Sequence, residues 1–319
     1  MSPDPREGSS RSLVVVPEYL PPRHVEMLRE VAEVHYDPDL HGDRDLLLSA
    51  VADASAVLIR NRTIVDTEFL TAARQFEIVG RLGVGLDNID VAAVEEAGVE
   101  LVVARGGNAV SVAEYVIGAM LVCQRGVFGM TQSMLAGRWP RQGHAFGREL
   151  KDKTLGLVGF GAIAREVAKR AVGFDMQIVA YDPYLTPDTT WGEVQPVTFD
   201  VLLTRSDVVS IHVPLNDETR GLFDAAALAS MKPDSTIVNT SRGGIVDERA
   251  LAAALRSGTI GSAALDVFTT EPLGPEAAAT FAGLDNLLLT PHLAGNATEA
   301  VDRIAFSTVE AVLRKLASG

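Results

Sequence analysis

The sequence predicts an α/β protein with doubly wound parallel sheets, and three features support this. At roughly 150 residues per domain, the 319 residues suggest about two domains. In both halves, short β-branched and apolar runs alternate with amphipathic, helix-like stretches. The second half also contains a glycine-rich turn between a predicted strand and a predicted helix, which is typical of this fold class.

The composition bounds the function before any motif is considered. Apolar types make up 47% of the residues and charged types 22%, so the chain can bury a sizeable core. Lys and Arg total 28 against 42 Asp and Glu, and the net charge of −14 argues against nucleic acid as a partner. The single cysteine, Cys123, excludes an intrachain disulfide and a cysteine-based metal site. No metal is expected.

The N-terminal segment and the hydropathy pattern favour a cytoplasmic location. The first dozen residues are polar, include two prolines and lack the apolar core of a signal peptide. A membrane span needs roughly 18 or more apolar residues, and the most apolar stretch, Tyr115–Cys123, is about half that length. We therefore expect no membrane partner.

In the first half, four short apolar runs predict buried strands, and amphipathic segments between them predict helices. The expected strands are Leu13–Val16, Ala56–Ile59, Glu77–Val79 and Glu100–Val103. The expected helices are Pro22–Ala32, Asp43–Ala52, Asp66–Ala73 and Val91–Ala97.

The second half repeats the pattern more clearly, with a helix at Ile163–Val172 after the first strand. The expected strands are Lys153–Gly159, Gln177–Tyr181, Val208–Val213, Thr236–Asn239, Ala263–Phe268 and Asn286–Thr290. Strands that alternate with helices predict a parallel sheet covered on both faces.

Between the halves, Val110–Leu135 predicts a long helix that is apolar nearly all round in its first part. A helix without a wet face must be covered by another domain or by a second subunit. We favour the second subunit, and therefore a homodimer.

The glycine-rich turn, Gly159-Phe160-Gly161-Ala162-Ile163-Ala164, has the dinucleotide-binding pattern G-x-G-x-x-G/A. Gly159 permits the tight turn, and Gly161 lets the backbone approach a pyrophosphate. The start of the following helix supplies unpaired N–H groups and a positive dipole end. Alternatively, the glycines serve only strand–helix packing.

Asp182 ends the next predicted strand, where a carboxylate accepts hydrogen bonds from the adenosine ribose. An acid there repels a 2′-phosphate, and its neighbours Tyr181, Pro183 and Tyr184 include no arginine. These residues predict NAD rather than NADP as the cofactor.

Three later segments each place a reactive group just after a predicted strand: Arg242, Glu271 and His292. An arginine can hold a carboxylate and polarise a carbonyl, and a histidine can donate and accept the proton of an alkoxide. A carboxylate beside the imidazole orients it. With a nicotinamide cofactor, this set fits reversible hydride transfer to a 2-keto acid. Taken singly, each residue has an ordinary structural explanation.

Several motifs in order show that the chain resembles the D-isomer-specific 2-hydroxyacid dehydrogenase family, and most closely its D-3-phosphoglycerate dehydrogenase branch. The similarity runs from about Leu13 to the C-terminus. Its motifs are Gly80–Asp90 (GRLGVGLDNID), Gly106–Glu114 (GGNAVSVAE), the glycine-rich turn, His212–Leu215, the Arg242 segment, Asp266–Pro272 and Pro291–Gly295.

The resemblance implies a cofactor domain inserted in a substrate domain. Residues 1–104 and 293–319 would form a flavodoxin-like substrate domain, and residues 105–292 an NAD-binding Rossmann domain with the dimerisation helix. It also implies roles at matching positions. Arg242, Glu271 and His292 match the substrate-binding arginine, the acidic partner and the acid/base, and Asp266 matches a contact to the nicotinamide carboxamide. The remaining implied cofactor contacts are Ala162, Ile163, Asp182, Val213 and Thr240, and the backbone at Val84 and Gly85 would hold the substrate carboxylate.

The sequence departs from the family pattern in two places. Ala162 stands where relatives often have an arginine near the pyrophosphate, which weakens the expected attraction for NAD. The sequence also stops soon after the last predicted helix, so we expect none of the C-terminal feedback regulation that the phosphoglycerate branch often has.

Two strand-end arginines, Arg60 and Arg81, resemble residues that bind the distal phosphate in phosphoglycerate dehydrogenases, although Asn61 stands where a serine is usual. Alternatively, they pair with local acids such as Asp87 or Asp90. A second anionic group on the substrate would satisfy them, which favours 3-phosphoglycerate and equally admits sulfolactate. The alternatives are a hydroxypyruvate or glyoxylate reductase and, outside enzymes, an NAD-sensing corepressor-like binding protein.

Overall fold

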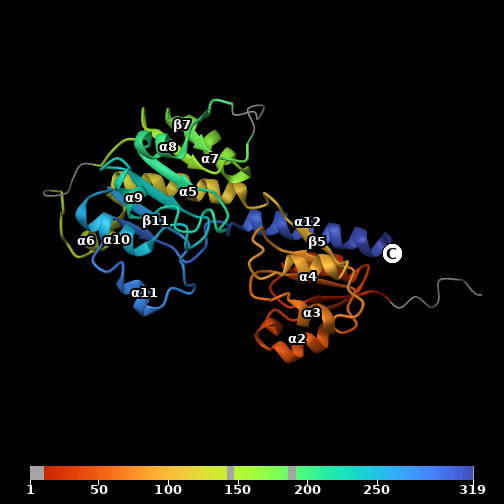
Figure 1. The fold of residues 1–319 in the computed structure, drawn as a ribbon. Coiled ribbons are helices and arrows are strands. Elements are labelled where there is room, and N and C mark those ends of the chain that lie inside the picture. The colour runs from red at the N-terminus through yellow and green to blue at the C-terminus, as the bar shows by residue number, and fades with distance from the viewer. Residues whose placement is uncertain (1–10, 142–146, 186–191, 319) are drawn as a thin grey trace, which may run out of the picture. The chain divides into compact units, whose positions relative to one another are not determined.

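The computed structural model describes residues 11–141, 147–185 and 192–318. The chain forms two compact units (Figure 1): unit 1 comprises Met1–Asn108 and Ala297–Gly319, and unit 2 comprises Ala109–Asn296. These boundaries lie four residues beyond the predicted domain boundaries at 104 and 292. Of the polar N-terminal segment, residues 1–10 lie outside the described part.

Unit 1 is built on a five-stranded parallel sheet with the order β2-β1-β3-β4-β5. Its strands are β1 (Leu13–Val16), β2 (Glu33–Tyr36), β3 (Ala56–Ile59), β4 (Ile78–Arg81) and β5 (Glu100–Val103). Its helices are α1 (Pro22–Arg29), α2 (Arg44–Val51), α3 (Thr67–Ala72), α4 (Val91–Glu96) and α12 (Thr298–Ser318), with a short 3-10 turn at Leu40–Gly42.

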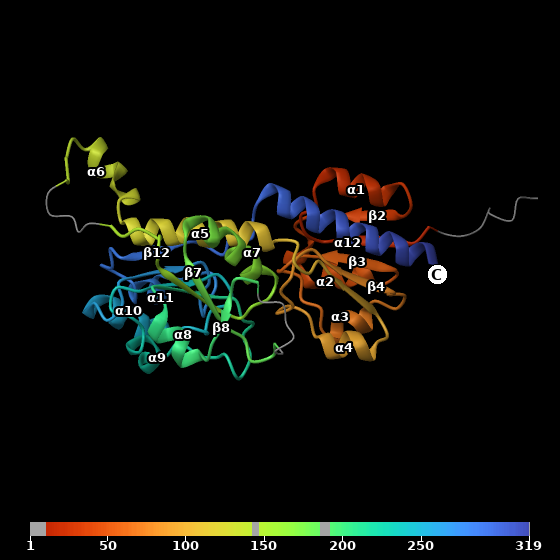
Figure 2. The same ribbon diagram turned by 90° about the horizontal axis from the view of Figure 1, so that it is seen from above.

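Alternating strand residues of unit 1 face opposite layers, as the pleat of a strand requires. Val14 and Val16 belong to a core cluster with residues of α1 and α12, whereas Val15 belongs to a second cluster with residues of α2, α3 and α4. Figure 2 shows these two helix layers on opposite faces of the sheet. Both faces are therefore buried, which explains the continuous apolar runs in the sequence.

Unit 2 contains a seven-stranded parallel sheet with the order β12-β11-β10-β9-β6-β7-β8. Its strands are β6 (Thr154–Val158), β7 (Gln177–Tyr181), β8 (Gln195–Pro196), β9 (Val208–Ile211), β10 (Thr236–Asn239), β11 (Ser262–Leu265) and β12 (Leu287–Leu289). Its helices are α5 (Ala109–Arg125), α6 (Thr131–Leu135), α7 (Ala162–Ala171), α8 (Phe199–Arg205), α9 (Ala225–Ala229), α10 (Glu248–Ser257) and α11 (Pro275–Ala279). Short 3-10 turns occupy Phe128–Met130 and Val172–Phe174.

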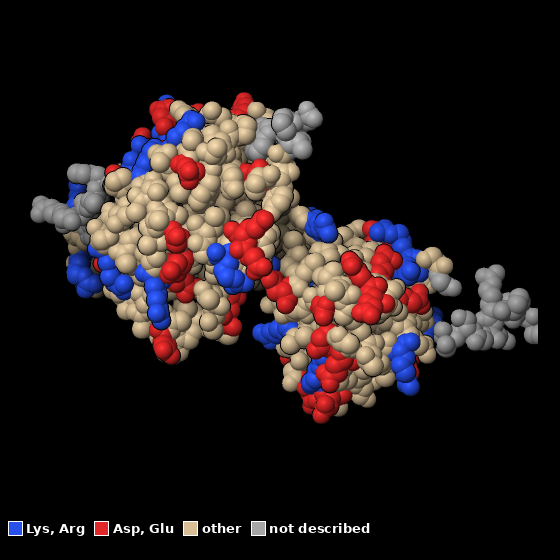
Figure 3. Space-filling model, in the orientation of Figure 1, with Lys and Arg blue, Asp and Glu red and all other residues tan. Residues whose placement is uncertain are grey.

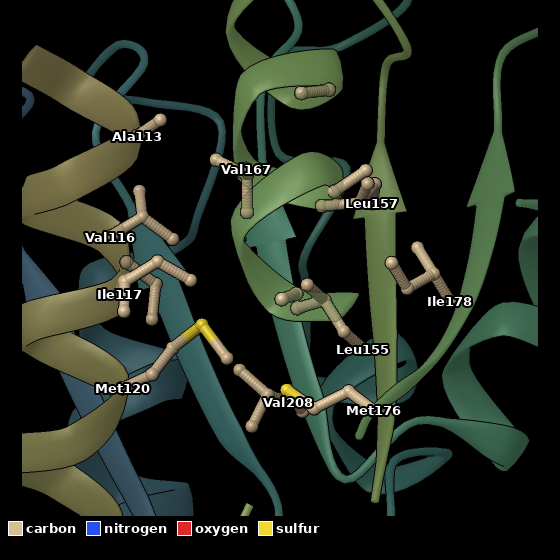
Figure 4. Close-up of a cluster of buried hydrophobic side chains, with 14 of the residues drawn as sticks. Ala113, Val116, Ile117, Met120, Leu155, Leu157, Val167, Met176, Ile178 and Val208 are labelled. Carbon is tan, nitrogen blue, oxygen red and sulfur yellow. The ribbon is translucent and has the colours of Figure 1, made fainter. Parts of the chain in front are cut away.

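Most apolar side chains of helix α5 are buried within its own unit, so they do not require a second subunit to cover them, and the predicted homodimer stays a prediction. Figure 4 shows Val116 and Met120 of α5 directed toward Val167 of α7 and Leu155 of β6. Val116 and Met120 are fully buried in this cluster, and so is Ala113. The apolar surface of the helix is thus used in the core of unit 2.

The predicted long helix is also interrupted. Helix α5 ends at Arg125, and Gly126 follows with a φ of 62°, a left-handed conformation that suits glycine. Among the described residues, no single helix is long and apolar enough to cross a membrane. Only α5 taken together with Phe128–Leu135 passes by length and composition, and these two segments are bent by 74°.

Candidate active site

All strands of unit 2 run parallel, so the segments that follow them meet at one edge of the sheet. The order of the strands reverses between β6 and β9, which is where ligands bind in open α/β sheets. The predicted residues at this edge are Gly159 after β6, Asp182 after β7, Val213 after β9, Thr240 and Arg242 after β10, Asp266 and Glu271 after β11, and His292 after β12.

The glycine-rich turn has a backbone that only glycine adopts easily. Gly159 has a φ of 85°, and a Cβ added there would lie 2.8 Å from the carbonyl oxygen of His212. The next N–H, that of Phe160, donates to Asp182 Oδ2 at 2.9 Å. The carboxylate therefore braces the turn in addition to its predicted role toward the ribose.

The start of α7 fits a pyrophosphate. Gly161 precedes the helix, no side chain caps it, and a Cβ added at Gly161 would meet nothing within 4 Å. Ala162 is exposed and Ile163 half-buried at this end. At the end of β10, the buried Thr240 Oγ1 has no hydrogen-bond partner among the described residues, as expected for a group that binds a ligand. These features fit a dinucleotide.

The turn that carries Arg242 is held by Asn239, which is 1% exposed. The Asn239 side-chain amide donates to the carbonyl of Arg242 at 2.9 Å, and its oxygen accepts from the N–H of Ser241 at 3.0 Å. The Ser241 hydroxyl donates to the carbonyl of Val213. A single buried amide thus fixes the backbone from which the Arg242 side chain extends.

A glycine brings the Arg242 turn against the segment after β11. A Cβ added at Gly243 would lie 1.9 Å from the carbonyl oxygen of Phe268 and 2.4 Å from the nitrogen of Thr269. Any side chain at this position would collide with the backbone of Phe268 and Thr269, so only glycine fits here. The turn that carries Arg242 therefore packs directly on the loop that leads to Glu271.

His292 and Glu271 form the pair that the sequence predicted. His292 Nδ1 lies 2.7 Å from Glu271 Oε2, and the other carboxylate oxygen accepts from the N–H of Phe268 at 3.0 Å. The carboxylate thus favours a proton on Nδ1, and Nε2 is left as the nitrogen that can exchange a proton with a substrate. The imidazole is 48% exposed, so a ligand can reach it.

Asp266 organises the turn beneath this pair. Its side chain is 1% exposed. Oδ1 accepts from the N–H of Leu293 at 2.9 Å, and Oδ2 accepts from the N–H of Ala294 at 2.8 Å. Its own carbonyl accepts from the N–H of His292 at 2.8 Å. The predicted contact of Asp266 to the nicotinamide stays a prediction, whereas these hydrogen bonds give it a structural role.

His212 is not equipped to be the acid/base. Burial lowers the pKa of this histidine to about 3, so the imidazole is neutral. Its Nε2 lies 2.9 Å from the Ser210 hydroxyl, and its carbonyl lies against Gly159. Its backbone, rather than its ring, borders the glycine-rich turn.

In unit 1, the loop that carries Arg60 is clamped from two sides. The carboxylate of Glu18, 3% exposed, accepts from the N–H groups of Arg60 at 2.8 Å, Arg62 at 3.2 Å and Thr63 at 3.0 Å. The side-chain amide of Asn88 donates to the carbonyls of Arg60 and Thr63 at 3.0 and 2.5 Å. Within the described part of the chain, the Arg60 guanidinium has no partner.

Arg81 and the Val84–Gly85 backbone also lie in unit 1. Arg81 is 7% exposed, and its Nε donates to the carbonyl of Gly85 at 2.8 Å. The guanidinium lies over Gly83, where an added Cβ would be 2.4 Å from Nη1. Arg81 therefore shapes this loop. In the described ranges, the N–H groups of Val84 and Gly85 donate to no protein atom, which suits the predicted contact to a carboxylate.

The described residues hold no group of three or more His, Cys, Asp or Glu side chains placed to bind a metal ion. On the face shown in Figure 3, Lys and Arg side chains lie in small separate groups interspersed with acidic ones. This distribution agrees with the net charge of −14 and offers no continuous basic surface there.

Sequence reasoning missed the residues that hold the loops. The side chains of Glu18, Asn88 and Asn239 hold neighbouring loops in place by hydrogen bonds to backbone groups. Their residue types are common at strand ends, and in Glu18 and Asn88 the partners lie 25 or more positions away. For Glu18 and Asn239, a polar residue close to the end of an apolar run was the only signal in the sequence, and Asn88 had none of this kind.

The fold is that of a dinucleotide-binding domain, and the N-terminus of α7 is open to a pyrophosphate. Together with an arginine and a carboxylate–imidazole pair at the same edge of the sheet, these features are those of a nicotinamide-dependent oxidoreductase. Residues 117–294 match the family model described as "D-isomer specific 2-hydroxyacid dehydrogenase, NAD binding domain". The chain belongs to the D-isomer specific 2-hydroxyacid dehydrogenase family, which confirms the predicted fold class, the reaction class and NAD as the cofactor.

Three similar proteins differ in their substrates. The chain is 47% identical to (S)-sulfolactate dehydrogenase of Chromohalobacter salexigens, over 95% of the chain and 98% of that protein. It is 40% identical to hydroxypyruvate reductase of Thermotoga maritima, over 86% and 89%. It is 40% identical to D-3-phosphoglycerate dehydrogenase of Mycobacterium bovis, over 97% of the chain but only 57% of that protein.

Among solved structures, the TT0316 protein from Thermus thermophilus superimposes with a TM-score of 0.88 at 31% identity, over 96% of this chain and 97% of that one. The similarity thus extends over both units. The expectation that the phosphoglycerate branch is the nearest is not supported, because the sulfolactate dehydrogenase shares more identity over a larger part of that protein's own length.

Proposed function

We propose that this NAD-dependent dehydrogenase acts on a D-2-hydroxy acid that carries a second anionic group, with sulfolactate ahead of 3-phosphoglycerate. The S label of sulfolactate describes the D arrangement, because the sulfomethyl group outranks the carboxylate in naming priority. Ranking sulfolactate ahead of 3-phosphoglycerate reverses our expectation from the sequence, and this ranking rests on the greater similarity to the sulfolactate dehydrogenase. Hydroxypyruvate, which has a neutral tail, is the second candidate.

The observation that carries the proposal is the Arg60 loop. Glu18 and Asn88 occupy its backbone groups, yet the Arg60 guanidinium has no partner in the described residues. A guanidinium that has no side-chain partner and extends from a well-held loop fits an anionic ligand, because the loop does not have to be ordered when the ligand binds. Buried Arg81 is proposed to act indirectly, through the Val84–Gly85 loop.

The residues of unit 2 are proposed to carry the chemistry. When bound, NADH supplies the hydride. Arg242 holds the carboxylate of the keto acid and polarises its carbonyl. His292 donates the proton from Nε2 to the oxygen that becomes the hydroxyl, and Glu271 stabilises the charged imidazole. In the reverse direction, His292 accepts the same proton.

The test compares sulfopyruvate, phosphohydroxypyruvate and hydroxypyruvate in the oxidation of NADH, in wild type and in Arg60→Ala. Loss of a charge-assisted contact is expected to raise KM for the anionic-tail substrate roughly tenfold or more. KM for hydroxypyruvate should change little. Arg62→Ala is the matched control, since Arg62 lies on the same loop and its side chain contacts His41.

The outcomes separate the candidates. A wild-type preference for sulfopyruvate, lost in Arg60→Ala, supports the proposal. A preference for hydroxypyruvate, or an equal loss for all three acids in Arg60→Ala, would reject Arg60 as the group that recognises a distal anion.

We further propose that the protein acts as a homodimer through residues 127–141, which follow α5. Five large apolar side chains there are 44–76% exposed: Val127, Phe128, Met134, Leu135 and Trp139. The segment also contains two arginines and no acidic residue, whereas the whole chain carries −14. A second copy therefore offers apolar surface to these side chains and, from its acidic remainder, negative charge to the two arginines.

A further inference from the structure

Tyr115 of α5 contacts the turn that carries the proposed acid/base. Its hydroxyl lies 2.6 Å from Thr290 Oγ1, although the two residues are 175 positions apart. Thr290 directly follows β12 and stands two residues before His292. Because α5 is long, buried and anchored on the sheet, Tyr115 extends from a rigid part of unit 2.

The direction of the hydrogen bonds follows from the number of protons. Thr290 Oγ1 lies 2.5 Å from Asp266 Oδ1, and an ionised carboxylate can only accept, so Thr290 donates. The single hydroxyl proton of Thr290 is then used, and Tyr115 must donate to Thr290. Burial raises the pKa of Tyr115, and the Asp266 charge acts in the same direction, so the donor keeps its proton.

Asp266 connects Thr290 to the backbone around His292 through hydrogen bonds. Besides Thr290, its carboxylate accepts from the N–H groups of Leu293 and Ala294. The N–H of His292 donates to the Asp266 carbonyl, and the His292 backbone has a φ of 55°, which is unfavourable for a residue with a side chain. A strained backbone of this kind persists only where surrounding groups hold it.

We propose that Tyr115 is a positioning residue for the acid/base, acting through the hydrogen bonds Tyr115–Thr290–Asp266 on the turn that aims His292. The inference rests on the proposed role of His292. It assigns to α5 a function in the reaction in addition to its place in the core. Tyr115 touches neither substrate nor cofactor in this assignment.

The experiment removes the hydroxyl alone. Loss of one hydrogen bond in Tyr115→Phe is expected to lower kcat about fivefold to tenfold. KM for NADH should stay the same, and the isotope effect with NADH deuterated at the transferred hydrogen should rise because hydride transfer becomes slower. Thr290→Val should act alike, the double variant should add little, and Thr290→Ser should recover the rate.

The control is Tyr36→Phe, which removes a half-buried tyrosine hydroxyl that donates to the Leu20 carbonyl at 3.2 Å in unit 1. It should change neither kcat nor the isotope effect. A merely structural role of Tyr115 would lower the amount of folded enzyme and leave the isotope effect unchanged. That result, or full additivity with Thr290→Val, would overturn the proposal.

A second readout separates this inference from the proposed function. His292→Ala is expected to lower turnover by about two to four orders of magnitude if His292 is the acid/base. Whether or not it does, the ring resonances of His292, assigned by their loss in this variant, report how Nδ1 is held by Glu271. Tyr115→Phe should shift them and Tyr36→Phe should not. Unshifted resonances would reject the positioning role on their own.

Discussion

At the scale of single residues, Asp182 has two tasks that a substitution can separate. Its Oδ2 accepts the N–H of Phe160 in the glycine-rich turn, and its Oδ1 accepts the N–H of Tyr184. Neither hydrogen bond by itself requires the negative charge, because a neutral carbonyl oxygen also accepts, but a carboxamide has only one such oxygen for the two N–H groups. The charge is the property that we expect to repel a 2′-phosphate.

Asp182→Asn keeps one acceptor, which can serve the Phe160 N–H of the glycine-rich turn at the expense of the Tyr184 N–H, and removes the charge. The ratio of kcat/KM with NADPH to that with NADH should rise roughly tenfold or more, because like-charge repulsion is lost. The control is Asp200→Asn in the first turn of α8, an exposed acid of the same unit. An unchanged ratio would show that another group excludes NADP.

Single residues also mark the limit of what the sequence could predict. The pairing of His292 with Glu271 was predictable, because both follow strands that end at one edge of a sheet. The buried carboxylate of Glu18 was not, since acids are rarely buried and its three N–H partners lie 42 to 45 positions away. Such contacts depend on the folded path of the chain rather than on a local pattern.

At the scale of elements, Asp207 ties the start of β6 to the loop before β10. Its Oδ2 accepts from the N–H of Thr154 at 2.9 Å and lies 3.1 Å from the ammonium of Lys232. Burial alone would raise the pKa of Asp207, but the Thr154 hydrogen bond and Lys232 outweigh it and lower the pKa below its ordinary value of 3.8.

The lowered pKa of Asp207 predicts a pH-dependent contribution to stability. A carboxyl group with a lowered pKa stabilises the fold above its ordinary value and loses this effect as the pH falls toward its folded value. Calorimetry should therefore show Asp207→Asn to be less stable by about 1 kcal/mol at pH 7. The difference should shrink below 3.8. Asp53→Asn, at a 70% exposed acid, should show almost no difference at either pH.

The elements that sequence predicted best are the buried strands, because burial on both faces leaves continuous apolar runs. Strand β2 was missed, since Glu33–Tyr36 is an edge strand with alternating exposed positions. Strand β8 has only two residues and includes a proline. For α5 the pattern correctly required cover, but it could not say that α7 and the sheet supply it.

At the scale of the whole molecule, the apolar segment 127–141 predicts the oligomeric state. Trp139→Asp should convert a dimer into a monomer in sedimentation experiments, because it places a charge among apolar side chains. The matched control is Leu46→Asp on α2, which is 58% exposed. A monomeric wild type, or a dimer that survives Trp139→Asp, would contradict the proposed interface.

The path of the chain through unit 1 has a consequence for how the protein is made. Helix α12 covers β4, where Gly80 leaves only 2.8 Å between an added Cβ and Thr308 Cγ2. This helix is translated after all of unit 2. On the ribosome, the part of one apolar face that α1 does not cover must therefore stay exposed until α12 is made, while the inserted unit, whose strands are contiguous in the sequence, can fold first. Chaperones that recognise exposed apolar strands would meet the nascent chain during this interval.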